Sequence, residues 1–340
     1  MKLGFGIGIL CLGSVIINTM PVWVGNLSRN PEVGDGLAGA FASLVLFSAA
    51  LTCAGLFQNA VSYIARYALP LAFAALAFGE HWHVTILAGT CIGLGVSMGS
   101  LTQEALHAIR RSEKSLTSIG LAMSIGLVVS LVFYLMLPLF DLSPFWFLFL
   151  LSLPIVALRG TPFVTDGAGH VSTGSIRAPT KFIGFFVMMG AYWTFLELYG
   201  ARFNNGDAVA LWLLASLVSG ACGSILAARL PGTWQSKAQK VGLSLAAASG
   251  AASYVAQDIS VFGITILVNA FALFLFFPIY LQTAGERMPQ AMAGYLVGFA
   301  AGGLAGAVLV KIGGYQLMAL ALLLSGFIAL IPRSRRSFLQ

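Results

Sequence analysis

Charge is what this sequence has least of. Only 9% of its 340 residues are Asp, Glu, Lys or Arg, whereas a soluble globular chain carries about 25%. Hydrophobic residues make up 59% of the chain, and the mean hydropathy is +0.92. So much apolar surface does not fit inside one water-soluble core, so most of it must face lipid or other buried helices. We therefore expect an integral membrane protein.

Several functional motifs are also missing. The four cysteines fall inside apolar runs and form no C-x-x-C pair, which argues against a disulfide framework or a zinc site. The sequence has no Walker motif for ATP and no acid/base or nucleophile cluster of the kind that enzymes need. The net charge of +7 comes from basic residues at the ends of apolar runs, a pattern of membrane topology rather than of nucleic-acid binding. We expect no cofactor, no metal, no nucleic-acid partner and no enzymatic activity.

Long apolar runs fill the remaining sequence. Each is close to the roughly 20 residues that a helix needs to cross a bilayer. The first run begins directly after Lys2 and is too long for a cleavable signal, so we interpret it as a membrane span. The sequence thus predicts an all-α integral membrane protein with about twelve transmembrane helices, at 3–25, 37–57, 61–79, 84–106, 117–139, 144–158, 182–203, 208–229, 238–256, 261–283, 290–311 and 314–332.

The positions of the basic residues support an even number of helices. With twelve spans and both termini in the cytoplasm, only Arg29, Arg202 and Lys311 of the 18 Lys and Arg residues lie outside. Cytoplasmic segments of membrane proteins carry an excess of Lys and Arg. An odd number of spans would destroy this asymmetry. We expect both termini in the cytoplasm and the protein in a bacterial inner (plasma) membrane.

The chain divides near its midpoint. The segment 159–181 is polar and rich in Gly, Ser, Thr and Pro, as expected of a cytoplasmic linker. It separates residues 1–158 and 182–340, which we expect to form two bundles of six helices each. Short strings recur at offsets of 172 and 173 residues, namely Gly34-Asp35 with Gly206-Asp207 and Ala42–Val45 with Ala215–Val218. Because six is even, such a repeat is parallel, about an axis normal to the membrane.

At this point the chain resembles the major facilitator superfamily of transporters. The resemblance is strongest over Leu87–Gly126, with a glycine-rich helix and a basic loop, and over Asn269–Gly314, with FPIYLQ and a glycine-rich helix. The family's loop motif after the second helix is reduced here to Gly55, with Asn59 where the family has an aspartate. The resemblance implies two six-helix bundles around a central cavity lined by helices one, four, seven and ten.

Those four predicted helices each have a polar or aromatic face at helical spacing. The resemblance makes these faces candidates for binding the solute, with helix–helix packing through small residues as the alternative. The candidate residues are Asn18 and Trp23 on helix one, Ser97 and Ser100 on helix four, Tyr192 and Trp193 on helix seven, and Asn269, Phe276 and Tyr280 on helix ten.

Two acidic residues are candidates for proton coupling. Glu197 lies about six residues, roughly 9 Å, inside the expected outer end of helix seven. A carboxylate inside the membrane is costly and usually functional. The alternative for Glu197 is an ion pair with Arg202 near the outer surface. Glu104 lies where helix four meets the cytoplasm, and its alternative is a solvated interface.

The sequence predicts a secondary active transporter. The absence of Lys and Arg deep in the four cavity helices disfavours phosphates and multiply charged anions, and favours a neutral, amphipathic or cationic organic solute. We expect its partners to be that solute, a proton or other coupling ion and membrane lipid, and we expect a monomer. The alternatives are a non-transporting membrane sensor or scaffold of the same fold, and a membrane-embedded transferase.

Overall fold

The computed structural model describes residues 2–55, 61–139, 143–157 and 180–331. Within these ranges the chain forms twelve α-helices and no strand. The predicted linker 159–181 lies almost entirely outside the described residues, as does Asn59. The helices of the first part are α1 (Lys2–Asn18), α2 (Met20–Leu27), α3 (Gly34–Cys53), α4 (Val61–Ala77), α5 (Val84–Arg110), α6 (Ser115–Met136) and α7 (Pro144–Ala157).

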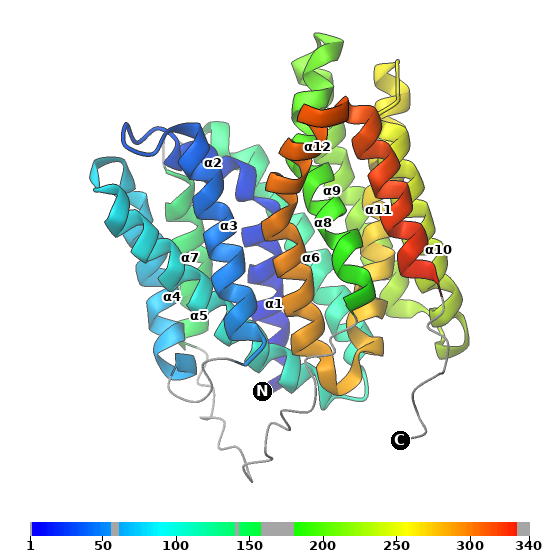
Figure 1. Cartoon of the computed structure of the whole chain (residues 1–340). Helices are drawn as coiled ribbons and strands as arrows, with labels where there is room; N and C mark the ends of the chain where they lie inside the picture. The colour runs from blue at the N-terminus through cyan, green and yellow to red at the C-terminus, as the bar shows by residue number, and fades with distance from the viewer. Residues whose placement is uncertain (1, 56–60, 140–142, 158–179, 332–340) are drawn as a thin grey trace, which may run out of the picture.

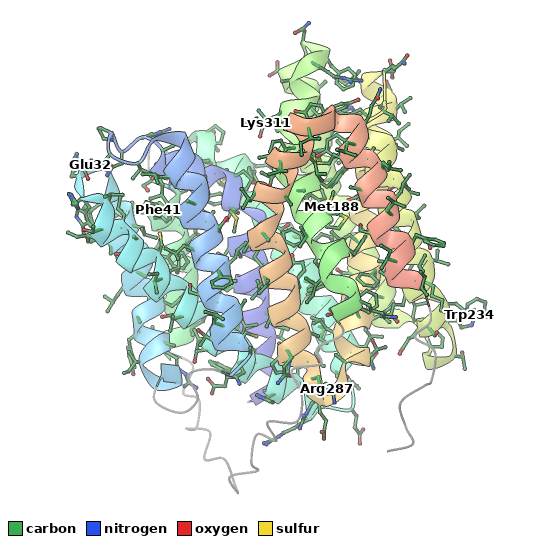
Figure 2. All side chains as sticks on the ribbon, in the orientation of Figure 1. Glu32, Phe41, Met188, Trp234, Arg287 and Lys311 are labelled. Atoms are coloured by element: carbon green, nitrogen blue, oxygen red, sulfur yellow. The ribbon has the colours of Figure 1, made fainter. Side chains whose placement is uncertain are left out.

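The second part contains fewer but longer helices. They are α8 (Ile183–Gly200), α9 (Gly206–Arg229), α10 (Gly232–Ser253), α11 (Ile259–Thr283) and α12 (Met288–Leu330). We call the end of the molecule at which α1 begins the inner end. Arg287 and Trp234 lie toward this end, whereas Glu32 and Lys311 lie at the opposite, outer end (Figure 2).

All twelve predicted spans coincide with α-helices, but the first is broken. Its two pieces, α1 and α2, are bent by 56° relative to one another. Pro21 lies in the first turn of α2 and has no N–H, so it removes one hydrogen bond across the break. Side chains compensate at two neighbouring carbonyls. The Trp23 indole donates to the Ile16 carbonyl at 3.1 Å, and the Thr19 hydroxyl donates to the Val15 carbonyl at 2.8 Å.

The last two predicted spans are the two limbs of α12. They meet at Gly313 and Gly314, whose backbone angles are not helical. Gly314 has φ 66° and ψ −167°, a conformation that only glycine adopts easily. The chain reverses direction at this point, so the two limbs run antiparallel (Figure 1).

The helices pack in two groups that meet along two seams. Helices α1 to α7 pack among themselves, and α8 to α12 do the same. In Figure 1 the first group lies mostly to the left and the second to the right. The groups meet where α6 packs on α9 and where α3 packs on the first limb of α12. The internal repeat stays a prediction.

The chain is an integral membrane protein. Five helical segments of the described residues are long and apolar enough to span a membrane by length and composition, and the bent pair α1–α2 makes a sixth if it counts as one span. Three further helical segments are apolar but shorter: Leu37–Cys53 of α3, Ile64–Ala77 of α4, and α7. Helix α10 is the most polar of the long helices, because its first turns read GTWQSKAQK.

Glycines bring the helices of the second group close together. A Cβ at Gly302 of α12 would lie 2.5 Å from the backbone of Gly190 and Ala191 of α8. At Gly298 a Cβ would lie 2.5 Å from the Phe186 side chain, and at Gly306 it would lie 2.7 Å from Phe195. The repeated G-x-x-x-G of this span therefore packs directly against α8.

Candidate functional site

A small cavity lies between the two groups of helices. Its volume is about 40 Å³, room for a few water molecules. Its walls come from α1, α5 and α6 of the first group and from α11 and α12 of the second. Most of the lining is apolar, and the polar side chains in it are Ser14, Asn18, Thr102 and Tyr295.

Asn18 lies in this lining, directly at the break between α1 and α2. Its side-chain amide donates to the Ser14 carbonyl at 2.7 Å and to the Ser14 hydroxyl at 3.2 Å. Its backbone carbonyl accepts a hydrogen bond from the Tyr134 hydroxyl at 2.9 Å. This carbonyl is free for Tyr134 because the N–H of Val22 bonds to the Thr19 carbonyl instead. The break thus creates a polar point in an apolar wall.

Glu197 belongs to α8, in the other group of helices. The residue is exposed and lies in the last turn of α8, because the helix ends at Gly200. A 3₁₀ turn (Ala201–Phe203) follows α8 directly, so the helical segment ends where expected and the depth of Glu197 in the membrane stays a prediction.

The alternative of an ion pair between Glu197 and Arg202 is wrong. The Arg202 guanidinium donates to the Ala256 carbonyl and lies 3.9 Å from the centroid of the Tyr199 ring. None of the ion pairs among the described residues includes Glu197. Glu197 therefore has no ion pair with Arg202, the basic residue that follows it in the sequence.

Glu104 is not at a solvated interface, so that interpretation was wrong. Its carboxylate forms an ion pair of 2.7 Å with Arg66, and the two side chains are 9% and 10% exposed. The Arg66 guanidinium also lies 4.7 Å from the centroid of the Phe5 ring. The pair joins α4 to α5 near the inner end, inside the first group of helices.

Ser97 and Ser100, the candidates of the fourth predicted span, lie on α5 and are buried. Neither is in the lining of the cavity, which takes Met98 and Thr102 from the same helix. Trp23, the candidate at the end of the first predicted span, lies on α2 and is also buried. Its ring packs beside Phe145, with the ring centroids 6.2 Å apart, and its indole N–H donates to the Ile16 carbonyl.

The candidates of the seventh and tenth predicted spans lie on α8 and α11, and they pack mainly within the second group. Tyr192 is buried and its hydroxyl lies 3.1 Å from the Ser253 hydroxyl, while Trp193 is half-buried with its ring against Tyr192. Asn269 is fully buried, and its amide donates to the Ala246 carbonyl at 2.7 Å. The buried rings of Phe276 and Tyr280 stack on one another.

Other residues of α11, the helix of the tenth predicted span, line the cavity. Leu273, Phe274 and Phe277 line it, as does Tyr295 of α12. The face of α11 that carries Asn269 was predicted to line the cavity. In the structure Asn269 instead binds another helix of its own group. The roles of all the predicted site residues in solute binding or coupling stay predictions.

The two groups are joined at their inner ends. The Cys53 thiol of α3 lies 3.4 Å from the Pro289 carbonyl of α12. Between α6 and α9, Thr117 donates to the Ala228 carbonyl at 3.2 Å and Ser124 donates to the Ala221 carbonyl at 3.4 Å. Each of these three hydrogen bonds starts from the inner half of its helix.

The described side chains form no group of three or more His, Cys, Asp or Glu residues that could hold a metal ion.

Comparisons with known proteins were made at the level of sequence and of structure. No family model matches the sequence, and no curated protein matches it. Among solved structures, the human organic anion transporter MFSD10 (TETRAN) has a TM-score of 0.69 at 16% identity, over 96% of this chain and 97% of that chain. A second similar protein is the fucose:proton symporter FucP of E. coli.

FucP matches in two structures. A variant has a TM-score of 0.68 at 14% identity, over 96% of this chain and 97% of that chain. The structure of FucP in the outward conformation, described as a major facilitator superfamily transporter, has a TM-score of 0.69 at 14% identity, over 97% of this chain and 98% of that chain. Matches of this extent cover the whole architecture, although the identities are low. The chain has the fold of the major facilitator superfamily transporters.

Proposed function

We propose that this protein is a secondary active transporter that moves a small organic solute by alternating access. The observation that carries the proposal is the cavity between the two groups of helices, with walls from both and with the groups joined at their inner ends. A site between two rigid groups can open to either side when the groups rock against each other. Because the groups are in contact at the inner end, we take this conformation to expose the site to the outer side.

The lining supports a solute that is not an anion. The cavity wall carries no charged side chain, and its polar groups are two hydroxyls, one amide and one phenol. An anion would need a basic partner or a cluster of N–H donors. A neutral, amphipathic or cationic solute fits this wall. We place the inner end in the cytoplasm, because the basic residues concentrate there, and we take the membrane to be a bacterial inner membrane.

Glu197 provides a way to couple transport to a proton. In the present conformation the Glu197 side chain is exposed, and in this proposal the outer end is filled with water. Closing the outer end would bring α6 and α1 over it and remove that water. Because burying an unpaired carboxylate is costly, closure requires a proton or a cationic group on Glu197. Protonation would thus be linked to which side is open.

Transport into proteoliposomes tests the proposal. Vesicles with an imposed pH gradient are offered radiolabelled sugars, organic anions and organic cations, and we expect accumulation of at least one class above that of protein-free vesicles. In Glu197→Gln the side chain cannot take or release a proton, so accumulation driven by the gradient should be lost while exchange of solute persists. Glu286→Gln changes an exposed carboxylate at the inner end and should behave like the parent. Transport is contradicted if no class crosses, and the coupling role is contradicted if Glu197→Gln accumulates solute like the parent under the same pH gradient.

A further inference from the structure

The two sides of the cavity differ in chemistry. The first group of helices contributes two hydroxyls and an amide, from Ser14, Asn18 and Thr102, and it contributes no aromatic ring. Every ring of the lining comes from the second group, and the ring centroids of Phe277 and Tyr295 lie 4.4 Å apart. A solute between the groups therefore meets hydrogen-bonding groups on one side and aromatic surface on the other.

Two hydroxyls of the lining are not used by the fold. Within the described part of the chain, the side chains of Thr102 and Tyr295 make no hydrogen bond. Thr90, on the same helix as Thr102, instead donates to the Ile86 carbonyl at 2.8 Å. Neither lining hydroxyl is sealed off, unlike the buried and unpaired side-chain oxygen of Asn269. Both are available to a molecule in the cavity.

These two hydroxyls belong to different groups of helices. A Cβ on Gly13 of α1 would lie 4.0 Å from the Thr102 hydroxyl oxygen, so this oxygen is on the side of α5 that faces α1. The ring of Tyr295 on α12 is held by three phenylalanine rings at centroid distances of 4.4 to 5.3 Å, those of Phe186, Phe277 and Phe299. Helices α5 and α12 also contact one another. One molecule that binds both hydroxyls would join the two groups.

We infer that the solute is an uncharged, flat heteroaromatic compound with hydrogen-bonding groups on its edge. Thr102 and Tyr295 bind this edge, and Phe277 contacts the ring. The inference rests on the proposed transport function and narrows it, leaving Glu197 to the proton. The rings would attract a cation, but no carboxylate of the lining balances its charge and both hydroxyls would stay unpaired. A sugar has more hydroxyls than this mostly apolar wall can satisfy.

Binding of matched compounds to the purified full chain, measured by isothermal titration calorimetry, tests the inference. Uracil is flat and uncharged, with donors and acceptors on its edge. Dihydrouracil has the same edge on a saturated ring, and dimethyluracil, methylated on both nitrogens, has the ring without N–H donors. Orotate adds a carboxylate, and benzyltrimethylammonium carries a cation on a flat ring. We expect uracil to saturate the protein below about 10 mM and each altered compound to bind at least about fivefold more weakly.

Single substitutions locate the edge of the bound solute. Thr102→Val removes one hydroxyl at nearly constant shape, and Tyr295→Phe removes the other while the ring packing stays. Each should weaken uracil binding about fivefold or more, because a hydrogen bond is lost. Thr102→Ser keeps its hydroxyl and should bind like the parent. The matched controls Thr90→Val on α5 and Tyr315→Phe on α12 lie outside the lining and should leave binding unchanged.

The inference is overturned if uracil does not saturate the protein below roughly 10 mM, if any altered compound binds as tightly, or if either hydroxyl variant binds uracil like the parent. Should Thr102→Val fail to fold, Thr102→Ala takes its place. Failure of the transport proposal looks different, and radiolabelled uracil joins the solutes offered to vesicles. If uracil binds as predicted but no offered solute enters, transport is contradicted and the binding class stands. Uptake of a sugar or a cation without uracil binding leaves transport intact and removes the heterocycle.

Discussion

At the scale of single residues, the pair of Arg66 and Glu104 makes the sharpest energetic prediction. The two side chains are about nine-tenths buried and lie 2.7 Å apart. Removing one partner of a buried pair leaves an uncompensated charge and costs about 3–5 kcal/mol, whereas replacing both is often close to neutral. We expect Arg66→Met and Glu104→Gln each to lower the free energy of unfolding by about that amount, and the double variant to recover most of the loss.

Unfolding in mixed detergent and SDS micelles measures these free energies. Glu113→Gln, at an exposed position in the loop after α5, is the control and should change stability by less than about 0.5 kcal/mol. If the losses of unfolding free energy in the two single variants simply add in the double variant, the two charges are not coupled. The ion pair of Arg66 with Glu104 would then contribute nothing to stability. Proton transport that depends on Glu104 itself would appear as a loss of coupling in Glu104→Gln that the double variant does not restore.

At the scale of elements, the contact between α8 and α12 depends on glycine at defined positions. A Cβ at Gly302 would lie 2.5 Å from the α8 backbone, whereas at its neighbour Gly303 the nearest atom would be 3.8 Å away, on Thr194. Backbone cannot move aside as a side-chain end can. Gly302→Ala should therefore destabilise the protein by about 1–3 kcal/mol, and Gly303→Ala should be neutral or slightly stabilising, because alanine favours a helix.

The same measurement of unfolding compares the two alanine variants. Equal stabilities for Gly302→Ala and Gly303→Ala would show that α8 and α12 are not packed as described. A loss confined to Gly302→Ala would show that the G-x-x-x-G face determines how closely these two helices approach.

The sequence predicted the helices well and their details poorly, for a physical reason. A run of apolar residues long enough to span a bilayer is a local property, so the spans could be assigned from composition. The break after Asn18 depends on Pro21, Thr19 and Trp23 acting together, and each is unremarkable alone. The face of α11 that lines the cavity depends on which neighbouring helix Asn269 binds. Only tertiary packing decides this.

At the scale of the whole molecule, the sequence predicted the class of fold because membrane topology follows from hydrophobicity and charge. The candidate site was predicted only in part. Asn18 was expected in the cavity wall and lies there, whereas Tyr134, Met123 and Phe277 carried no signal that distinguishes them from other residues of apolar helices. Glu104 was predicted as a candidate for proton coupling. Its ion-pair partner Arg66 was not predicted, because it lies 38 positions away in the sequence.

The central claim is that the two groups of helices must separate at the inner end for solute to leave. One substitution tests it, because the native Cys53 of α3 already lies 3.4 Å from the Pro289 carbonyl of α12. Pro289→Cys is made in a chain whose other cysteines are alanine, and the pair is oxidised in proteoliposomes. A control pair, Thr194→Cys with Gly303→Cys, joins α8 to α12 within one group. We predict that oxidation of the pair between Cys53 and position 289 stops solute uptake, that reduction restores it, and that oxidation of the control pair leaves uptake unchanged. Full uptake by the oxidised Pro289→Cys protein would contradict alternating access at this end.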